Sequence, residues 1–337
     1  GRNIGDEYFE ADPEMGFVDL DVLALGPVAN QVSVSFDHYW NSELSYPISA
    51  LVKKPPTDNE ITQRKSEFDA FVGKLFESEY LKALRDSDLS HKIQNHQIVT
   101  EWGPGTVVAD DPEKLTHDTD ETRYRLTEQL KPYLEGIKDE LIIFSPYFVP
   151  GESGVAFFQK LRDRGVRIKI LTNSLSSTDV GIVHAGYARY RKTLLRMGVE
   201  LHELNVNLTK EQRKARKEGK IGRSKSSLHA KCFVLDRESA FIGSLNLDPR
   251  SVVQNTEIGV VFKSDTVAGS ISEFFDNNID EAAFRLELRK SDNGAETLYW
   301  HGFVDGEMQT LNHEPYIGFW KRFGVGFMRI LPIESQI

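Results

Sequence analysis

The chain has 337 residues, of which 39% are hydrophobic, so it can bury one large core or two ordinary ones. Its net charge of −10 argues against a protein whose main task is to bind nucleic acid through the phosphates. The single cysteine, Cys232, excludes an intrachain disulfide, and no apolar run reaches the length of about eighteen residues that a membrane span requires.

Two stretches of the chain repeat each other. Residues 19–25 and 257–262 are predicted strands, and each is followed by a helix with apolar residues at helical spacing, over residues 27–37 and 266–276. The identical pairs at a constant offset are Val28 and Val267, Ala29 and Ala268, Ser33 and Ser272, Phe36 and Phe275, and Asp37 and Asp276. This pattern indicates an internal duplication.

The duplication places Asn3 opposite Asn246, so the first residues resemble the end of a motif. His229 precedes Asn246 by seventeen residues, and the histidine of the first copy would therefore lie before Gly1. We expect either a fragment of a longer protein with two motifs or a site completed by a second chain. We favour the fragment, because a symmetric dimer would duplicate the pieces that residues 1–37 already supply.

The segment after the first copy is predicted to be partly irregular and partly helical. Residues 44–59 contain three prolines, whereas residues 61–85 show helical periodicity. Residues 97–109 are predicted as two short strands, and the polar residues 110–119 as a boundary between lobes. We therefore interpret residues 1–117 as the C-terminal part of a first lobe with a helical connector, and residues 118–337 as a complete second lobe.

The second lobe alternates between helices and strands. The predicted helices are residues 122–136, 154–164 and 185–197, and the predicted strands are residues 140–145, 166–172 and 199–204. Continuous apolar strands between helices predict an α/β fold whose sheet is buried on both faces. The turns after strands, where such folds bind ligands, are rich in polar and aromatic groups at residues 145–151 and 172–187.

Two further stretches have patterns found near membranes. Residues 210–225 hold eight Lys and Arg against two Glu, which suits anionic lipid head groups and equally a solvated loop. Residues 316–330 mix aromatic, apolar and basic side chains, a pattern shared by interfacial helices and docked C-terminal helices. We favour a docked helix, because Gly324 and Gly326 weaken an isolated one.

The residues with the clearest chemistry follow the basic stretch. Residues 228–235 form an apolar run that predicts a buried strand, on which His229 and Lys231 leave the same face. Asp236 then points the other way or caps the turn. Because a buried strand seldom contains a lysine without a reason, we favour a functional pair over a core histidine beside a lysine that reaches the surface.

A second group of polar residues follows a short strand at residues 240–242. Gly243 ends this strand and allows a close approach to the backbone, and Ser244 and Asn246 are again two residues apart. Together with His229 and Lys231 they bring an imidazole, an ammonium, a hydroxyl and a carboxamide to a strand edge. This combination predicts a site for a phosphate ester.

The six residues follow the pattern His-x-Lys-x4-Asp-x6-Gly-Ser-x-Asn, which resembles the signature of the phospholipase D superfamily. The sequences STDVGIVHAGYARYR and NLDPRSVVQNTE resemble its cardiolipin synthase-like branch. The resemblance implies two pseudo-symmetric α/β lobes with helix-covered mixed sheets, of which the first is incomplete here. It also implies that no metal or other cofactor takes part.

By this resemblance, two histidines face each other across a pseudo-twofold axis. One attacks phosphorus and forms a phosphohistidine, while the other acts first as acid and then as base, the role implied for His229. Asp19 would orient His229 and Glu257 would orient the histidine of the first copy, although Asp21 shares a strand face with Asp19 and leaves that choice open. The implied catalytic residues are His229, Lys231, Asp236, Asp19 and Glu257, and the implied substrate-binding residues are Ser244, Asn246, Asn3, Tyr147 and His184. For the last two, a tyrosine that lines the core and a histidine that binds backbone at a helix start are equal alternatives.

The implied function is a phosphatidyltransferase that exchanges alcohols on a phospholipid such as phosphatidylglycerol. We expect it at an anionic membrane surface, peripheral to the cytoplasmic membrane of a bacterium, with no nucleic acid as partner. The N-terminal half of the same protein would complete the site, so this chain alone should be weakly active or inactive. The alternatives are a phospholipase D or phosphodiesterase that uses water as acceptor, and a noncatalytic lobe that binds phosphate.

Overall fold

The computed structural model describes residues 3, 5, 8, 15–52, 54–77, 79–206, 225–318, 324 and 326. The chain divides into two compact units, Gly1–Phe36 with Gly103–Ile337, and Asp37–Trp102. The predicted lobe boundary near residue 117 therefore falls inside the first unit. Residues 210–224 of the basic stretch and most of residues 316–330 lie outside the described residues, so the roles predicted for both stretches stay predictions.

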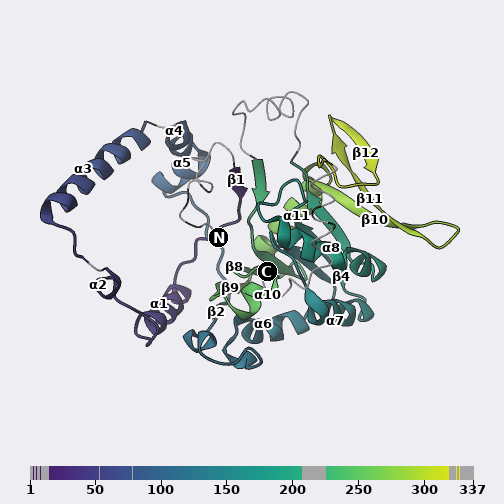
Figure 1. Ribbon diagram of the computed structural model, residues 1–337, viewed down its shortest axis with the longest axis horizontal. Coiled ribbons are helices and arrows are strands. Elements are labelled where there is room, and N and C mark those ends of the chain that lie inside the picture. Colours follow the sequence, from purple (N-terminus) through teal and green to yellow (C-terminus); the bar gives the residue numbers. More distant parts are fainter. Residues whose placement is uncertain are drawn as a thin grey trace. The chain divides into compact units, whose positions relative to one another are not determined.

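The first unit is built on a ten-stranded mixed sheet (Figure 1). In spatial order its strands are β12 (Glu307–Leu311), β11 (Glu296–Val304), β10 (Ala283–Lys290), β5 (Glu200–Leu204), β4 (Arg167–Thr172), β3 (Glu140–Phe144), β7 (Cys232–Leu235), β8 (Ser239–Gly243), β9 (Ile258–Lys263) and β2 (Gly105–Ala109). The central strands β3, β4 and β5 are parallel, and the other pairs are antiparallel. The α/β fold with a mixed sheet is thus confirmed.

Both faces of the sheet are buried. Along β3, Leu141 and Ile143 pack into one apolar cluster, and Ile142 and Phe144 pack into another. The first cluster is covered by α6 (Leu126–Glu135), α7 (Gly151–Asp163) and α8 (Gly181–Arg196), and the second by α11 (Asp265–Ala282). Residues of alternate parity on one strand therefore enter different cores, which explains the unbroken apolar runs in the sequence.

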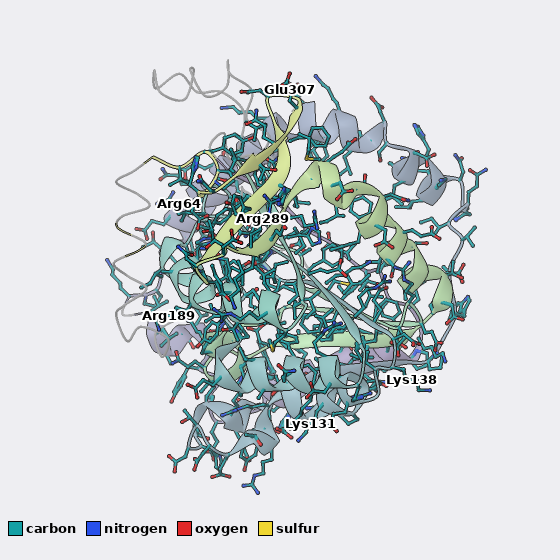
Figure 2. All side chains as sticks on the ribbon, turned by 90° about the vertical axis from the view of Figure 1, so that its right-hand side faces the viewer. Arg64, Lys131, Lys138, Arg189, Arg289 and Glu307 are labelled. Carbon is teal, nitrogen blue, oxygen red and sulfur yellow. The ribbon has the colours of Figure 1, made fainter. Side chains whose placement is uncertain are left out.

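The strands β10 to β12 end the sheet with a charged, antiparallel edge. Arg289 and Glu307 lie exposed on β10 and β12 (Figure 2). Glu287 accepts hydrogen bonds from Arg289 at 2.9 and 3.0 Å and lies 2.6 Å from His301 on β11. Charged side chains on an edge disfavour pairing with other chains.

The two copies of the repeat have different structures. The predicted strand over residues 19–25 is wrong, because the strand is β1 (Met15–Val18), which pairs in parallel with β6 (Lys225–Leu228). The helix α1 (Pro27–Trp40) forms as predicted, yet none of its residues is buried, whereas α11 buries Ala268 and Phe275. In the second copy β8 and β2 flank β9, and no described strand flanks residues 19–25.

The second unit is helical. It contains α2 (Ile48–Leu51), α3 (Asp58–Leu75), α4 (Glu79–Arg85) and α5 (Asp88–Gln94). Thr57 begins α3 with a capping box to Glu60, and the helix predicted over residues 61–85 is interrupted after Leu75. Across all described residues, no helix has both the length and the apolar character that crossing a bilayer requires.

Candidate active site

The chain changes its strand partner at His229. The predicted strand 228–235 is divided, because β6 pairs with β1 and β7 pairs with β3 and β8. The backbone N–H of His229 donates to Val18 O at 2.8 Å, so the imidazole starts where the first strand pair ends. His229 and Lys231 are both buried at this junction.

The side chain of Asn173 fixes the residue that precedes His229. Its amide nitrogen donates to Leu228 O at 2.9 Å, and its oxygen accepts from Leu228 N at 2.9 Å. Ser177 also donates to the Asn173 oxygen at 2.9 Å. Leu228 pairs with β1 on one side, and this pair of hydrogen bonds takes the place of a strand on its other side. Nothing in the local sequence pattern indicated the contact.

A chain of hydrogen bonds sets the tautomer of His229. Asp19 Oδ2 lies 2.8 Å from Nδ1, so Nδ1 carries the proton and Nε2 is left for the reaction side of the ring. Burial acts to raise the pKa of Asp19, but the hydrogen bonds from His229 and Leu20 and the charges of His229 and Lys231 lower that pKa below its usual value. Asp19 therefore stays ionised beside the imidazole.

The far nitrogen of His229 contacts a hydroxyl. Tyr8 Oη lies 3.0 Å from Nε2, and Asn3 Nδ2 donates to the same hydroxyl at 3.0 Å. The Tyr8 ring also packs edge-on against the imidazole, with centroids 4.8 Å apart. The hydroxyl thus shows that an oxygen fits within hydrogen-bond distance of Nε2.

Lys231 places an ammonium beside the same nitrogen. Its Nζ lies 2.9 Å from His229 Nε2 and donates to His229 O at 2.8 Å. Burial lowers the pKa of Lys231 to about 8, although Asp19, Glu257, Asp179 and Asp248 act to raise it. A partly desolvated ammonium gains more from an anionic ligand than a solvated one does.

Gly243, Ser244 and Asn246, at and after the end of β8, make different contacts. Ser244 donates to Glu257 Oε2 at 2.5 Å and accepts from the backbone N–H of Ile258 at 3.0 Å, so its hydroxyl is already engaged. Asn246 Oδ1 is buried and has no hydrogen-bond partner among the described residues. A Cβ at Gly243 would lie 2.5 Å from Ile258 O, so the glycine allows β8 and β9 to approach.

Glu257 faces the site as the counterpart of Asp19 in the repeat. Burial raises the pKa of Glu257, and hydrogen bonds from Ser244, Ser251 and Asn255 partly offset this effect. Its backbone N–H donates to Asp110 Oδ2 at 2.8 Å. The carboxylate is therefore held in a fixed position without an imidazole partner among the described residues.

A buried ion pair supports this carboxylate from behind. Lys114 Nζ lies 2.8 Å from Asp110 Oδ2, and the two side chains are 3% and 1% exposed. Lys114 also donates to Asn255 O at 2.6 Å and to Ser251 O at 3.2 Å, while Asp110 Oδ1 accepts from Leu126 N at 2.6 Å. These contacts join residues 110–114 to the loop that carries Asn255 and Glu257.

These groups surround a cavity of about 750 Å³. Seven of the residues expected at the site line it: Asn3, Tyr147, His229, Lys231, Ser244, Asn246 and Glu257. The lining residues that the sequence did not single out are Tyr8, Phe17, Leu115, Asp179, Gln254, Asn255 and Thr256. Asp179 and residues 254–256 lie within the two quoted family-like sequences, so a closer inspection of those stretches would have found them.

Two expected site residues lie elsewhere. Asp236 has φ +53° and its carboxylate accepts backbone hydrogen bonds from Lys138, Asp139 and Glu140 at 2.8 to 3.2 Å. It therefore ties the turn after β7 to the start of β3 and does not line the cavity. His184 is buried on α8, and its Nε2 lies 3.5 Å from Glu314 Oε1. It therefore does not line the cavity as expected.

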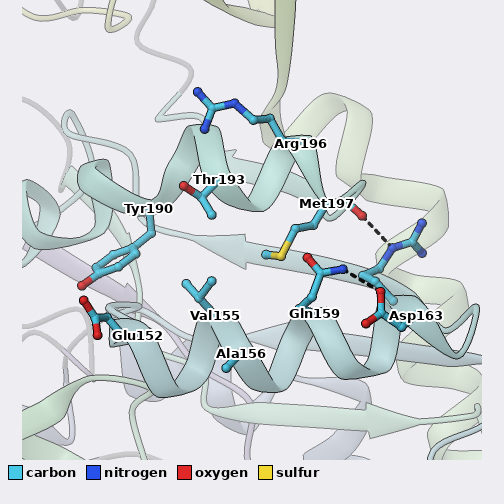
Figure 3. A pocket seen from close by; sticks show the side chains of 10 residues that line it. Glu152, Val155, Ala156, Gln159, Asp163, Tyr190, Thr193, Arg196 and Met197 are labelled. Carbon is cyan, nitrogen blue, oxygen red and sulfur yellow. Dashed lines mark hydrogen bonds between the residues drawn. The ribbon is translucent and has the colours of Figure 1, made fainter.

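A separate open groove of about 790 Å³ lies between α7 and α8 (Figure 3). Val155, Tyr190 and Met197 line it, and Gln159 donates to Asp163 within it at 2.7 Å. It contains no paired imidazole and ammonium of the kind formed by His229 and Lys231. The paired imidazole and ammonium line the cavity at the β6–β7 junction instead.

Comparison with known proteins places this site in a family. Residues 130–279 match the family described as "Cardiolipin synthase, PLD-like domain". The chain is 38% identical over 336 residues to cardiolipin synthase C of Escherichia coli (strain K12), which covers 99% of this chain and 69% of that protein. The chain belongs to the cardiolipin synthase family of the phospholipase D superfamily. The predicted membership in this family is thereby confirmed.

Two further proteins are similar to this chain at lower sequence identity. An uncharacterized protein of Helicobacter pylori (strain ATCC 700392 / 26695) is 30% identical over 340 residues, which span 98% of this chain and 63% of that protein. The solved phosphatidylserine synthase of Haemophilus influenzae Rd KW20 aligns with a TM-score of 0.44 and 13% identity over 76% of this chain and 53% of that one.

Lys231 gives this cardiolipin synthase-family site an expected pH dependence. The ammonium is charged below its pKa of about 8 and becomes neutral as the pH rises through that value. We expect the affinity for dimethyl phosphate to be constant near pH 7 and to fall by up to about tenfold per pH unit above pH 8. Titration calorimetry at several pH values measures this, with Lys231→Arg as the variant that keeps its charge. An affinity that stays constant to about pH 10 in the unmodified chain would contradict the assignment.

Proposed function

We propose that this chain carries the acid–base half of a phosphatidyltransferase of the cardiolipin synthase type. The observation that carries the proposal is one cavity that receives His229 Nε2, Lys231 Nζ and the carboxamide of Asn246, with Asp19 on the opposite nitrogen of the imidazole. Membership in the cardiolipin synthase family supports a phospholipid as the substrate.

Lys231 and Asn246 are the proposed phosphate-binding groups. The phosphoryl oxygens of a diester are negative and repel a nucleophile, and this charge grows on them as the attack proceeds. The buried ammonium of Lys231 offsets that charge, and the amide nitrogen of Asn246, which lines the same cavity, is the proposed further hydrogen-bond donor. Ser244 acts indirectly, because its hydroxyl holds Glu257.

His229 is the proposed general acid and base. Its protonated Nε2 gives a proton to the departing alcohol oxygen as the P–O bond breaks, and the neutral imidazole then takes a proton from the entering alcohol. Asp19 keeps the tautomer and stabilises the imidazolium. The hydroxyl of Tyr8, 3.0 Å from Nε2, stands in the position that we assign to these alcohol oxygens.

The proposed nucleophile is a second imidazole that binds Glu257. Asp19 holds His229, and Glu257 is the repeat counterpart of Asp19 and faces the same cavity. The attack would form a phosphohistidine and release the first alcohol. Among the described residues that line the cavity, His229 is the one histidine. We therefore expect weak turnover from this chain alone and fast turnover when the first copy of the motif is also present.

We also propose that the working protein binds peripherally at a bacterial cytoplasmic membrane. Its proposed substrate is a phospholipid, so the cavity must reach the level of the lipid phosphates. Phosphatidylglycerol is the proposed donor of the phosphatidyl group.

The test is a product analysis with a protein that carries both copies of the motif. Incubation with phosphatidylglycerol vesicles should yield cardiolipin and glycerol by mass spectrometry, and EDTA should leave the rate unchanged. An acid-labile phosphate on the protein should appear when the reaction is quenched early in alkali. Phosphatidic acid as the main product would instead indicate hydrolysis, and lipid binding without product would indicate a noncatalytic lobe. Robust turnover by the 337-residue chain alone would overturn the two-imidazole mechanism.

A further inference from the structure

We propose that Asp179, held by Tyr147, accepts a hydrogen bond from a hydroxyl of the head-group alcohol and thereby selects polyhydroxylated alcohols. The inference rests on the proposed function, because it assumes that a phosphodiester occupies the cavity. It adds a residue that distinguishes one alcohol from another, which the imidazole and the ammonium do not do. The two residues come from different turns, Tyr147 from the one after β3 and Asp179 from the one before α8.

Both side chains face the cavity that contains His229 and Lys231. Tyr147 Oη donates to Asp179 Oδ2 at 2.7 Å. Burial and the hydrogen bond to Asp179 raise the pKa of Tyr147 far above its usual value, so the hydroxyl keeps its proton and always donates. One carboxylate oxygen is thus used to fix the orientation of Asp179, and the other oxygen remains for a ligand.

The turn that carries Asp179 is rigid. Ser174 Oγ and Ser176 Oγ lie 2.8 Å apart, and Val180 N donates to Thr178 Oγ1 at 3.2 Å. Residues 173–178 are all buried, whereas Asp179 is exposed toward the cavity side. An exposed carboxylate on a buried polar turn is preorganised, so it loses little conformational freedom when a ligand binds.

A carboxylate is an unexpected group in a site for an anion. Asp19 is bound to His229, and Glu257 is bound to Ser244, so both have tasks at the two proposed imidazole positions. Asp179 has neither partner and would repel a phosphoryl oxygen. Its presence is explained if it faces the alcohol and not the phosphorus. A site built to bind a substrate hydroxyl discriminates strongly against the analogue that lacks it.

A hydroxyl fits this position better than an ammonium does. Lys231 already lies within range of the Asp179 charge, which acts to raise the pKa of Lys231. A second ammonium at the same carboxylate would face the first one. A neutral hydroxyl uses the acceptor without this repulsion.

The test compares two short-chain lipids that differ only in the alcohol. Dihexanoyl phosphatidylglycerol has two head-group hydroxyls, and dihexanoyl phosphatidylmethanol has the same charge and chains but no hydroxyl. Below their micelle-forming concentrations, the full chain should bind the glycerol lipid about tenfold more tightly by calorimetry. Asp179→Ala should bring that ratio close to one and leave the affinity for phosphatidylmethanol unchanged or higher. Glu152→Ala, an exposed carboxylate in the α7–α8 groove, should retain the ratio.

The outcomes separate this inference from the proposed function. If neither lipid binds the unmodified chain, or Lys231→Met leaves both affinities unchanged, the phosphate site itself is refuted. If both lipids bind and Asp179→Ala preserves the preference for the glycerol lipid, only the role of Asp179 is refuted. That role is also refuted if the preference that depends on Asp179 belongs to dihexanoyl phosphatidylethanolamine. Binding of phosphatidylmethanol by the variant serves as the internal measure of correct folding.

Discussion

Replacing His229 with alanine is expected to lower the rate of phosphatidyl transfer at least about 10³-fold in a protein that carries both copies of the motif. A departing alcohol is a strong base, and without an acid it must leave as an alkoxide. His229 Nε2 faces the cavity, and Asp19 on the other nitrogen stabilises the imidazolium that gives up this proton. The initial rate of cardiolipin formation from phosphatidylglycerol vesicles measures the effect.

The matched control for this variant is His313→Ala. His313 is exposed, its ring contacts Asn312 and it does not line the cavity, so the rate should change less than about twofold. His229→Ala should still bind dimethyl phosphate through Lys231, which separates a loss of chemistry from a loss of binding. A variant that keeps one tenth or more of the rate, with the same products, would remove His229 from the acid–base role.

The second half of the chain could be predicted well because its signals are local. The run of residues 141–144 is apolar on both strand faces, and a strand with two apolar faces has few alternatives to the middle of a covered sheet. The structure also brings His229, Lys231, Ser244 and Asn246 to one cavity, as their spacing suggests. β7 and β8 form an antiparallel hairpin, so the residues just before β7 and those just after β8 lie at the same edge of the sheet. Their spacing in the sequence therefore predicts their proximity.

In the first copy of the repeat, the local sequence pattern did not predict the structure. Residues 19–25 have a strand pattern like that of β9, but β9 obtains its backbone hydrogen bonds from β8 and β2. A strand forms only when its backbone groups pair with a neighbouring strand. Residues 19–25 have no described neighbour of this kind and are therefore irregular. For the same reason the run 228–235 is divided at His229, where the pairing with β1 ends at Val18 and the pairing with β3 and β8 begins at Cys232.

Side chains that bind backbone groups were the least predictable. Asp236 has the position of a motif residue, yet its carboxylate binds three consecutive N–H groups from the start of β3. Asn173 holds Leu228 in a similar way. Polar residues are ordinarily expected at the surface, and their burial depends on partners that are distant along the chain.

The polar stretch 110–119 contains a lysine, Lys114, whose burial depends on such distant partners. Lys114→Met is expected to lower the free energy of unfolding by about 3–5 kcal/mol. The variant keeps most of the side-chain volume but leaves the buried carboxylate of Asp110 without its cation and the carbonyls of Ser251 and Asn255 without a donor. Urea unfolding followed by circular dichroism measures the change.

Lys131→Met is the control, because Lys131 pairs with Glu128 at 3.9 Å while 57% exposed, and such pairs contribute less than about 1 kcal/mol. A loss below about 1 kcal/mol for Lys114→Met would contradict the expected contribution of this buried ion pair to stability. A large loss has a further consequence for the site. Lys114 and Asp110 hold the loop that carries Asn255 and Glu257, so the folded fraction of the variant should also bind a second imidazole less well. Residues that resemble a lobe boundary in the sequence would then position a group at the centre of the reaction.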